Sequence, residues 1–151
     1  MQESNAIQSY ANVFDGRGFA IIALKLMQTD QSSNFGFIRV LNTGGFVKNL
    51  EMRDCTIQTA SSLENFAFLV GSAQSSSLIS NCTSTNNLFT LADGTYNNLG
   101  GIVGFASNAT IEDSTTTNLT LISSSSSVST NAVGGNVGLM GKFFFFLFSL
   151  K

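Results

Sequence analysis

Two pairs of acidic residues have a spacing that would suit acid–base chemistry. Glu51 lies three residues before Asp54, and Glu112 directly precedes Asp113. Two carboxyl groups that face each other across a cleft can act as the acid and the base, or the nucleophile, of glycoside hydrolysis. The same side chains also suit a solvated strand face or a turn, and the surrounding sequence favours that structural interpretation. We therefore assign no catalytic residue and keep a carbohydrate-active enzyme as the alternative.

Composition excludes several other kinds of site. The chain has no histidine, so the usual catalytic triads and imidazole metal ligands are absent. Its 7 Lys and Arg and 9 Asp and Glu give a net charge of −2 without a basic run, which disfavours nucleic acid as a partner. Cys55 and Cys82 cannot complete a zinc site, and we expect two small buried groups rather than a disulfide. The sequence predicts no cofactor and no metal.

The other polar candidates have structural explanations. Asp93 lies in a turn sequence, ADGT, and no GGxGxD calcium repeat is present. Arg39, Lys48 and Arg53 lie close together in the sequence, within one unit of the repeat described below. We expect these charged side chains to keep the exposed sheet edges of the solenoid from pairing with other strands, and not to bind a ligand. The N-glycosylation pattern occurs three times, as expected by chance in a chain this rich in Asn, Ser and Thr: residues 81–83, 108–110 and 118–120.

Short blocks recur along the chain at steps of 31 to 34 residues. Val-Gly occurs at 70–71, 103–104 and 137–138, and a more distant block, FGFIRV, occupies residues 35–40. A second set of positions keeps a step of 32 and consists of Val47, Ile79 and Ile111, each followed two residues later by Asn49, Asn81 or Asp113. Two such sets held in register at this period indicate a solenoid or a repeat array.

Within each repeat unit, called a row here, apolar and polar residues alternate, and this alternation predicts strands. Residues 47–57, VKNLEMRDCTI, alternate apolar and polar side chains with one shift of phase, and residues 111–122 do the same. No window of about ten residues carries a helical stripe. The absence of proline suits a chain that is mostly hydrogen-bonded strand. The sequence therefore predicts an all-β fold, a right-handed parallel β-helix (β-solenoid) of about three to four coils.

Stacked coils give each repeated position a role, because equivalent residues lie about 4.8 Å apart in parallel sheets. The sequence predicts two interior columns of apolar side chains: Val47, Ile79 and Ile111, and Phe35, Phe66, Leu99 and Val133. It predicts left-handed turns or an amide ladder at Asn49, Asn81 and Asp113. Gly71, Gly104 and Gly138 are expected to allow a sharp corner, so GGIVG at 100–104 is one of several repeated corners and not a phosphate-binding loop.

Residues 99–114, LGGIVGFASNATIEDS, and residues 133–141, VGGNVGLMG, resemble the repeats of GLUG-motif proteins. The resemblance covers roughly residues 34–141. These are large secreted or surface proteins that build right-handed parallel β-solenoids, and they have no general catalytic residues. The resemblance implies a structural, adhesin-like segment of a longer array, located outside the cell or at its surface. It also implies variable loops that contact a cell-surface protein or a glycan. Polysaccharide lyases and hydrolases use parallel β-helices too, so the enzyme alternative stays open.

The repeat divides the chain into three parts. Residues 1–33 are expected to form an irregular first coil or an N-terminal cap, because the apolar stretch 18–27 is out of register. Residues 34–142 contain the solenoid rows, with expected bounds 34–63, 64–96, 97–130 and 131–142. Three Ser- and Asn-rich segments are expected to be variable loops: 60–64, 86–98 and 121–131.

The two ends of the sequence do not follow the repeat. Residues 143–151, FFFFLFSLK, are too short for a membrane helix, and we interpret them as a truncated or wrongly predicted end. The first ten residues, MQESNAIQSY, show no secretory signal. A surface location therefore rests on the resemblance alone.

Overall fold

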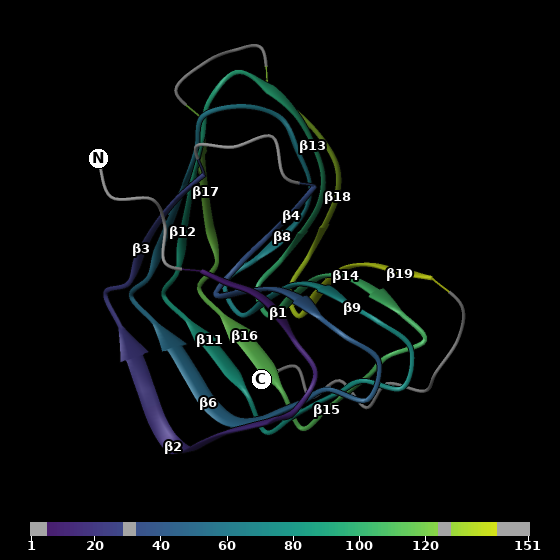
Figure 1. Ribbon diagram of the computed structural model, residues 1–151. Coiled ribbons are helices and arrows are strands. Elements are labelled where there is room, and N and C mark those ends of the chain that lie inside the picture. The colour runs from purple at the N-terminus through teal and green to yellow at the C-terminus, as the bar shows by residue number, and fades with distance from the viewer. Residues whose placement is uncertain (1–5, 29–32, 124–127, 142–151) are drawn as a thin grey trace.

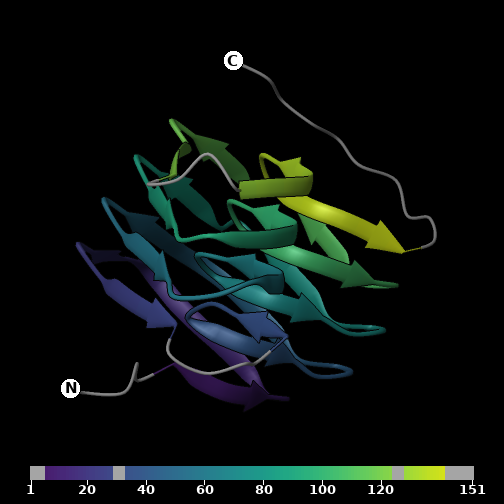
Figure 2. The same cartoon turned by 90° about the horizontal axis from the view of Figure 1, so that it is seen from above.

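The computed structural model describes residues 6–28, 33–123 and 128–141, and these ranges contain strands and turns without a helix. The chain winds through about 4 turns of a parallel β-solenoid. Figure 2 shows the coils stacked in sequence order, from the first coil in purple at one end to the last in yellow at the other. The predicted all-β fold of stacked parallel sheets is confirmed.

Each coil contributes strands to four parallel sheets, named A to D in the order in which the chain reaches them (Figure 1). Sheet A consists of β1 (Ile7–Tyr10), β5 (Ile38–Leu41), β9 (Val70–Ala73), β14 (Val103–Ser107) and β19 (Val137–Gly141). Sheet B consists of β2 (Val13–Ile22), β6 (Phe46–Arg53), β10 (Leu78–Ser80), β11 (Thr83–Thr85), β15 (Thr110–Glu112) and β16 (Thr115–Thr117). Sheet C consists of β3 (Lys25–Gln28), β7 (Thr56–Thr59), β12 (Leu88–Leu91) and β17 (Thr120–Ser123). Sheet D consists of β4 (Asn34–Phe35), β8 (Leu63–Ala67), β13 (Gly94–Gly100) and β18 (Val128–Gly134).

The pairing of strands in sheet B stacks the residues of the first predicted interior column. Ile79 of β10 pairs with Val47 of β6 on one side and with Ile111 of β15 on the other. Their exposed fractions are 0% for Val47 and Ile79 and 5% for Ile111. Three buried side chains at a constant step of 32 therefore line the same wall of the core, as the repeat predicts.

The second predicted column lies in sheet D and is interior along most of its length. Phe66 pairs with Phe35 and with Leu99, and all three are completely buried. Val133 pairs with Leu99 as predicted, but 50% of it is exposed. The predicted burial of Val133 is wrong; it lies on β18, one of the two edge strands of sheet D.

A residue with left-handed backbone at every fifth position bends the chain through sheets B and C. These corner residues have positive φ: Gly44, Asn49 and Asp54; Ser76, Asn81 and Asn86; Asn108, Asp113 and Asn118. The corner residue faces outward, and the next residue faces the core. Inward positions are therefore spaced alternately by three and two residues, as Val47, Leu50, Met52, Cys55 and Ile57 show by their burial. The predicted single shift of phase in this segment is in fact two shifts, one at each corner.

Four aromatic rings fill the middle of the solenoid. The ring centroid of Phe89 lies 4.5 Å from that of Phe68 and 5.0 Å from that of Phe66. Tyr96 packs on Phe66 with centroids 5.6 Å apart. The hydroxyl of Tyr96 lies 2.7 Å from the Thr59 hydroxyl, so its polar end is hydrogen-bonded although the side chain is fully buried.

The repeated glycines lie inside strands and not at corners. Gly71, Gly104 and Gly138 belong to β9, β14 and β19 and do not have positive φ, so the predicted sharp corner is wrong. A Cβ on Gly104 would lie 2.4 Å from the backbone nitrogen of Phe66, and one on Gly138 would lie 2.7 Å from that of Leu99. Glycine is required because the backbone of sheet D passes directly behind these strands of sheet A.

The first coil contains an irregularity in β2. This strand pairs with β6 along its length, but the register shifts between Asp15 and Phe19. Arg17 and Gly18, with φ of 52° and 78°, occupy this bulge beside the corner residue Asn49. Residues 18–27, expected to be an irregular first coil or cap, form the end of β2 and most of β3.

All three segments expected to be loops contain strand residues. Residues 60–64 include Leu63 and Glu64, the first two residues of β8. Residues 86–98 include all of β12 and the start of β13, which leaves only Ala92 and Asp93 between the two strands. In the segment 121–131, β17 extends to Ser123 and β18 begins at Val128. The expected loop assignment is therefore wrong for these strand residues. The segment 143–151 lies outside the described residues.

The buried column of sheet B yields a prediction on stability. Ile79→Asp places a carboxylate in the apolar core without a partner, so we expect a loss of more than about 3 kcal/mol in the free energy of unfolding. Gln58→Asp changes an exposed residue of β7 and should cost less than about 0.5 kcal/mol. Urea denaturation of both variants measures the difference, and equal losses would contradict the register.

The glycines of sheet A yield a second prediction. Gly104→Ala forces apart the backbones of β14 and β8, and we expect a loss of about 2 kcal/mol or more. Gly135→Ala is the matched control, because a Cβ there meets nothing within 4 Å and φ is not positive. Thermal melts monitored by circular dichroism should show a lower Tm for Gly104→Ala only. A similar melt for both variants would mean that sheets A and D do not approach as described.

Candidate functional site

The acidic residues considered for catalysis lie on the outer surface of the solenoid. Glu51 belongs to β6 and forms an ion pair with Arg53 at 3.9 Å. Asp54 and Asp113 are exposed corner residues, with φ of 53° and 48°, and Glu112 is an exposed residue of β15. The corner geometry explains the acidic residues at 54 and 113, because Asp tolerates left-handed backbone almost as well as Asn. Each pair is therefore part of a solvated face.

The other charged candidates are separated from one another. Asp93 is exposed in the turn between β12 and β13. Arg39 is buried, with its guanidinium carbon 5.3 Å from the centre of the Phe35 ring. Lys48 forms an ion pair with Asp15 at 3.5 Å and lies 5.3 Å from the centre of the Phe46 ring. Arg39, Lys48 and Arg53 have different neighbours and do not form a common anion site.

The described residues hold no group of three His, Cys, Asp or Glu side chains close enough to bind a metal ion. In the same part of the chain, no helix has the length and hydropathy of a membrane span. Cys55 and Cys82 are buried free thiols, which agrees with the expectation of two small core groups. Burial raises the pKa of Cys82 to about 11, so its thiol stays protonated at neutral pH.

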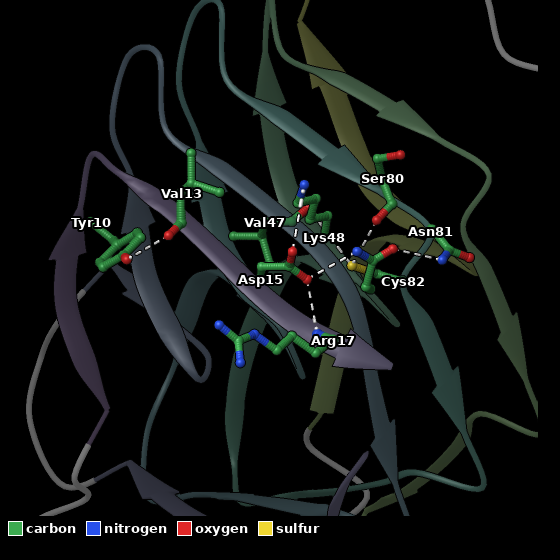
Figure 3. A network of polar contacts seen from close by, with 10 residues as sticks. Tyr10, Val13, Asp15, Arg17, Val47, Lys48, Ser80, Asn81 and Cys82 are labelled. Atoms are coloured by element: carbon green, nitrogen blue, oxygen red, sulfur yellow. Dashed lines mark hydrogen bonds and ion pairs between the residues drawn. The ribbon is translucent and has the colours of Figure 1, made fainter. Parts of the chain in front are cut away.

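The structure does bring together columns of asparagine side chains. Asn81 donates from Nδ2 to Oδ1 of Asn49 at 2.8 Å, and Asn49 donates in the same way to Asp15 at 2.9 Å (Figure 3). The amide ladder predicted at Asn49 and Asn81 is confirmed, and left-handed backbone is confirmed at both and at Asp113. The hydrogen bond from Asn49, followed by that from the Arg17 backbone, lowers the pKa of Asp15.

Two further amide ladders were not predicted. Asn118 donates to Asn86 at 2.9 Å along the third corner of the coils. In sheet D, Asn98 donates to Asn65 at 2.6 Å, and Asn65 donates to Asn34 at 2.8 Å. The steps between these residues, 31 to 33, match the repeat and are the sequence signal that could have identified the ladders. Such ladders join neighbouring coils on the surface in addition to the backbone bonds.

One buried asparagine supports the backbone inside the third corner. Asn87 is 1% exposed, and its Oδ1 accepts a hydrogen bond from the backbone N–H of Cys55 at 2.7 Å. Its Nδ2 donates to the Met52 carbonyl at 2.9 Å and to the Ser84 hydroxyl at 2.8 Å. The N–H of Cys55, directly after the corner residue Asp54, points into the core, and Asn87 of the next coil provides its acceptor.

The same arrangement recurs one corner earlier. The Ser114 hydroxyl accepts a hydrogen bond from the backbone N–H of Cys82 at 3.1 Å and donates to the Glu112 carbonyl at 2.7 Å. Sequence analysis did not identify Asn87 or Ser114, because a polar residue in a strand-rich sequence is normally assigned to the outer face. Their position directly after a corner residue was the available signal.

The outer face of sheet B changes character along the solenoid axis. The second coil presents the ion pair of Glu51 and Arg53, whereas the third and fourth coils present threonine at the paired positions: Thr83 and Thr85, and Thr115 and Thr117. No Lys or Arg occurs between residues 54 and 141. The later coils therefore offer a surface of hydroxyl and amide groups with few charges.

Stacked parallel sheets, corner ladders and a continuous apolar core define a β-solenoid repeat protein. Residues 95–122 match the family model of the GLUG motif, and this range runs from β13 to β17. The chain thus carries a GLUG repeat, in agreement with the resemblance found in the sequence. No curated protein and no solved structure matches the chain.

The two asparagines at positions 86 and 87 yield a prediction. Asn87→Gly leaves the Cys55 N–H and the Met52 carbonyl without their side-chain partner, and we expect a loss of about 2 kcal/mol or more. Asn86→Gly keeps the left-handed corner and loses one exposed ladder bond, so its cost should stay below about 1 kcal/mol. Guanidinium denaturation measures both, and a larger loss for Asn86→Gly would show that the surface ladder matters more than the buried amide.

Proposed function

We propose that this chain is a non-enzymatic, adhesin-like repeat segment that presents polar surface and connecting loops at or outside the cell surface. The β-solenoid fold and the GLUG motif support the broader class of structural repeat protein. The extension to adhesion is our proposal, and the chemistry of the outer face supports it.

The observation that supports this proposal most directly is the position of the acidic residues. Glycoside hydrolysis needs two carboxyl groups on opposite sides of a bound sugar. Glu112 and Asp113 are adjacent in the chain and both are exposed, one on a strand and one on a corner. Glu51 is engaged with Arg53 on the outer face of sheet B. These placements favour a solvated face over an acid–base pair.

The neutral face of the later coils suits hydrogen-bonding partners. Thr83, Thr85, Thr115 and Thr117 stand in a two-by-two array on β11 and β16, beside the amide ladder of Asn86 and Asn118. Rigid parallel strands hold these hydroxyl and amide groups at fixed spacing, about 4.8 Å between coils. A glycan or a polar protein surface would offer matching donors and acceptors.

A panel of polysaccharides tests the proposal. We expect the full chain to retain one or more glycans or cell-surface proteins weakly, and to release neither reducing ends nor unsaturated sugars. The variant Thr115→Val/Thr117→Val, which keeps strand propensity and removes two hydroxyl groups, should weaken retention at least threefold without changing the melt. Reproducible turnover that is lost in Glu112→Gln, with the melt unchanged, would establish the enzyme instead.

A further inference from the structure

Three sites in the chain match the acceptor pattern for N-linked glycans, and their backbones look alike. All three asparagines are exposed corner residues with left-handed backbone: Asn81 (φ 50°), Asn108 (φ 51°) and Asn118 (φ 53°). In each, the residue that follows faces the core and the threonine after it faces outward. Exposure and backbone therefore do not distinguish the three sites. Their side-chain hydrogen bonds do.

Asn81 and Asn118 use the nitrogen that a glycan would modify. Nδ2 of Asn81 donates to Asn49, and Nδ2 of Asn118 donates to Asn86, at 2.8 and 2.9 Å. Side chains in such a column repeat about every 4.8 Å, which is less than the thickness that a sugar ring and its substituents need beside a hydrogen-bonded neighbour. Nδ2 has two hydrogens and a glycan replaces one of them, so a sugar on either nitrogen competes with the ladder bond for the space between neighbouring coils.

Asn108 differs because its column contains no other amide. The residues at the same corner in the preceding coils are Ser76 and Gly44. The backbone carbonyl of Asn108 accepts a hydrogen bond from the Ser76 N–H at 3.0 Å, whereas its side chain makes no hydrogen bond within the described part of the chain. Ala109 is 2% exposed and fixes the corner, and Thr110 is exposed at the start of β15.

We propose that Asn108 is the preferred position at which the folded protein carries an N-linked glycan. The donor is an oligosaccharide attached to a polyprenyl diphosphate. Nδ2 of Asn108 forms a bond to the anomeric carbon, the bond from that carbon to the diphosphate oxygen breaks, and the diphosphate leaves with the electron pair. The nitrogen loses one proton to a base of the transferase, and nothing is oxidised or reduced. Because the donor is met in the secretory pathway, the inference rests on the proposed surface location.

Folding follows the transfer of the glycan and depends on which asparagine carries it. The transferase needs an extended acceptor, so all three asparagines are accessible to it before the coils stack. A glycan on Asn81 or Asn118 then opposes a surface ladder, whereas a glycan on Asn108 projects into solvent. Because one exposed ladder bond contributes less than about 1 kcal/mol, we expect folded, secreted protein to carry more sugar on Asn108 than on Asn81 or Asn118.

Secretion of the full chain from a eukaryotic host, behind a cleavable leader, tests the inference. Mass spectrometry of the folded fraction should find a higher glycan occupancy on Asn108 than on Asn81 or Asn118, and peptide-N-glycosidase should shift the gel mobility. Thr83→Val/Thr120→Val removes the other two patterns but keeps the ladder asparagines, and it should keep most of the shifted protein. Thr110→Val should lose most of it, with its melt unchanged.

Two results would overturn the inference: a folded fraction without sugar on Asn108, or one in which Asn81 or Asn118 carries as much sugar as Asn108. The experiment is independent of any binding partner. A glycosylated protein that binds no glycan or cell surface would reject the proposed function and leave the modification site in place.

Discussion

The left-handed residue at every fifth position is the constraint on which the rest of this structure depends. The side chains of each such residue and of the residue before it point outward, and the side chain of the residue after it points into the core. This conformation costs an ordinary L-residue about 1 to 2 kcal/mol and costs asparagine, aspartate or glycine less. The repeated Asn and Asp of sheets B and C are therefore needed for the backbone first. Their side chains then become available for a second role.

That second role differs between the surface and the core. On the surface, the corner amides of successive coils meet and form ladders, as in the contact of Asn81 with Asn49. In the core, the residue after a corner turns its backbone N–H inward, where water cannot reach it. Asn87 and Ser114 supply acceptors for these groups from the next coil. The buried polar groups thus compensate for the geometry that the corners impose.

The sequence predicts what the repeat makes visible, and it misses what depends on contacts between different sheets. The column of Val47, Ile79 and Ile111 and the Asn49–Asn81 ladder follow directly from a step of 32 residues. The role of Gly104 does not, because it depends on how closely sheet D passes behind sheet A. The bulge at Arg17 and Gly18 is also invisible, since it interrupts the spacing in a single coil. For the carboxylates, the sequence already favoured a solvated strand face or a turn, and the structure places Glu51 and Glu112 on strands and Asp113 at a corner.

The corners also restrict where such a sequence can gain or lose residues during evolution. One residue added within sheet B or C would turn every core side chain outward, and every outer side chain inward, up to the next corner. The number of residues per coil in these sheets therefore stays at 32, as between Thr56, Leu88 and Thr120. Between sheets C and D no corner has to be matched, and the step grows to 33 between Leu63 and Tyr96 and to 34 between Tyr96 and Thr130. The connection between sheets A and B also varies, because the step falls from 33 between Ala73 and Ala106 to 32 between Leu78 and Thr110. Duplication or recombination between repeats can therefore change the length of the chain at these two connections, whereas sheets B and C keep a fixed length.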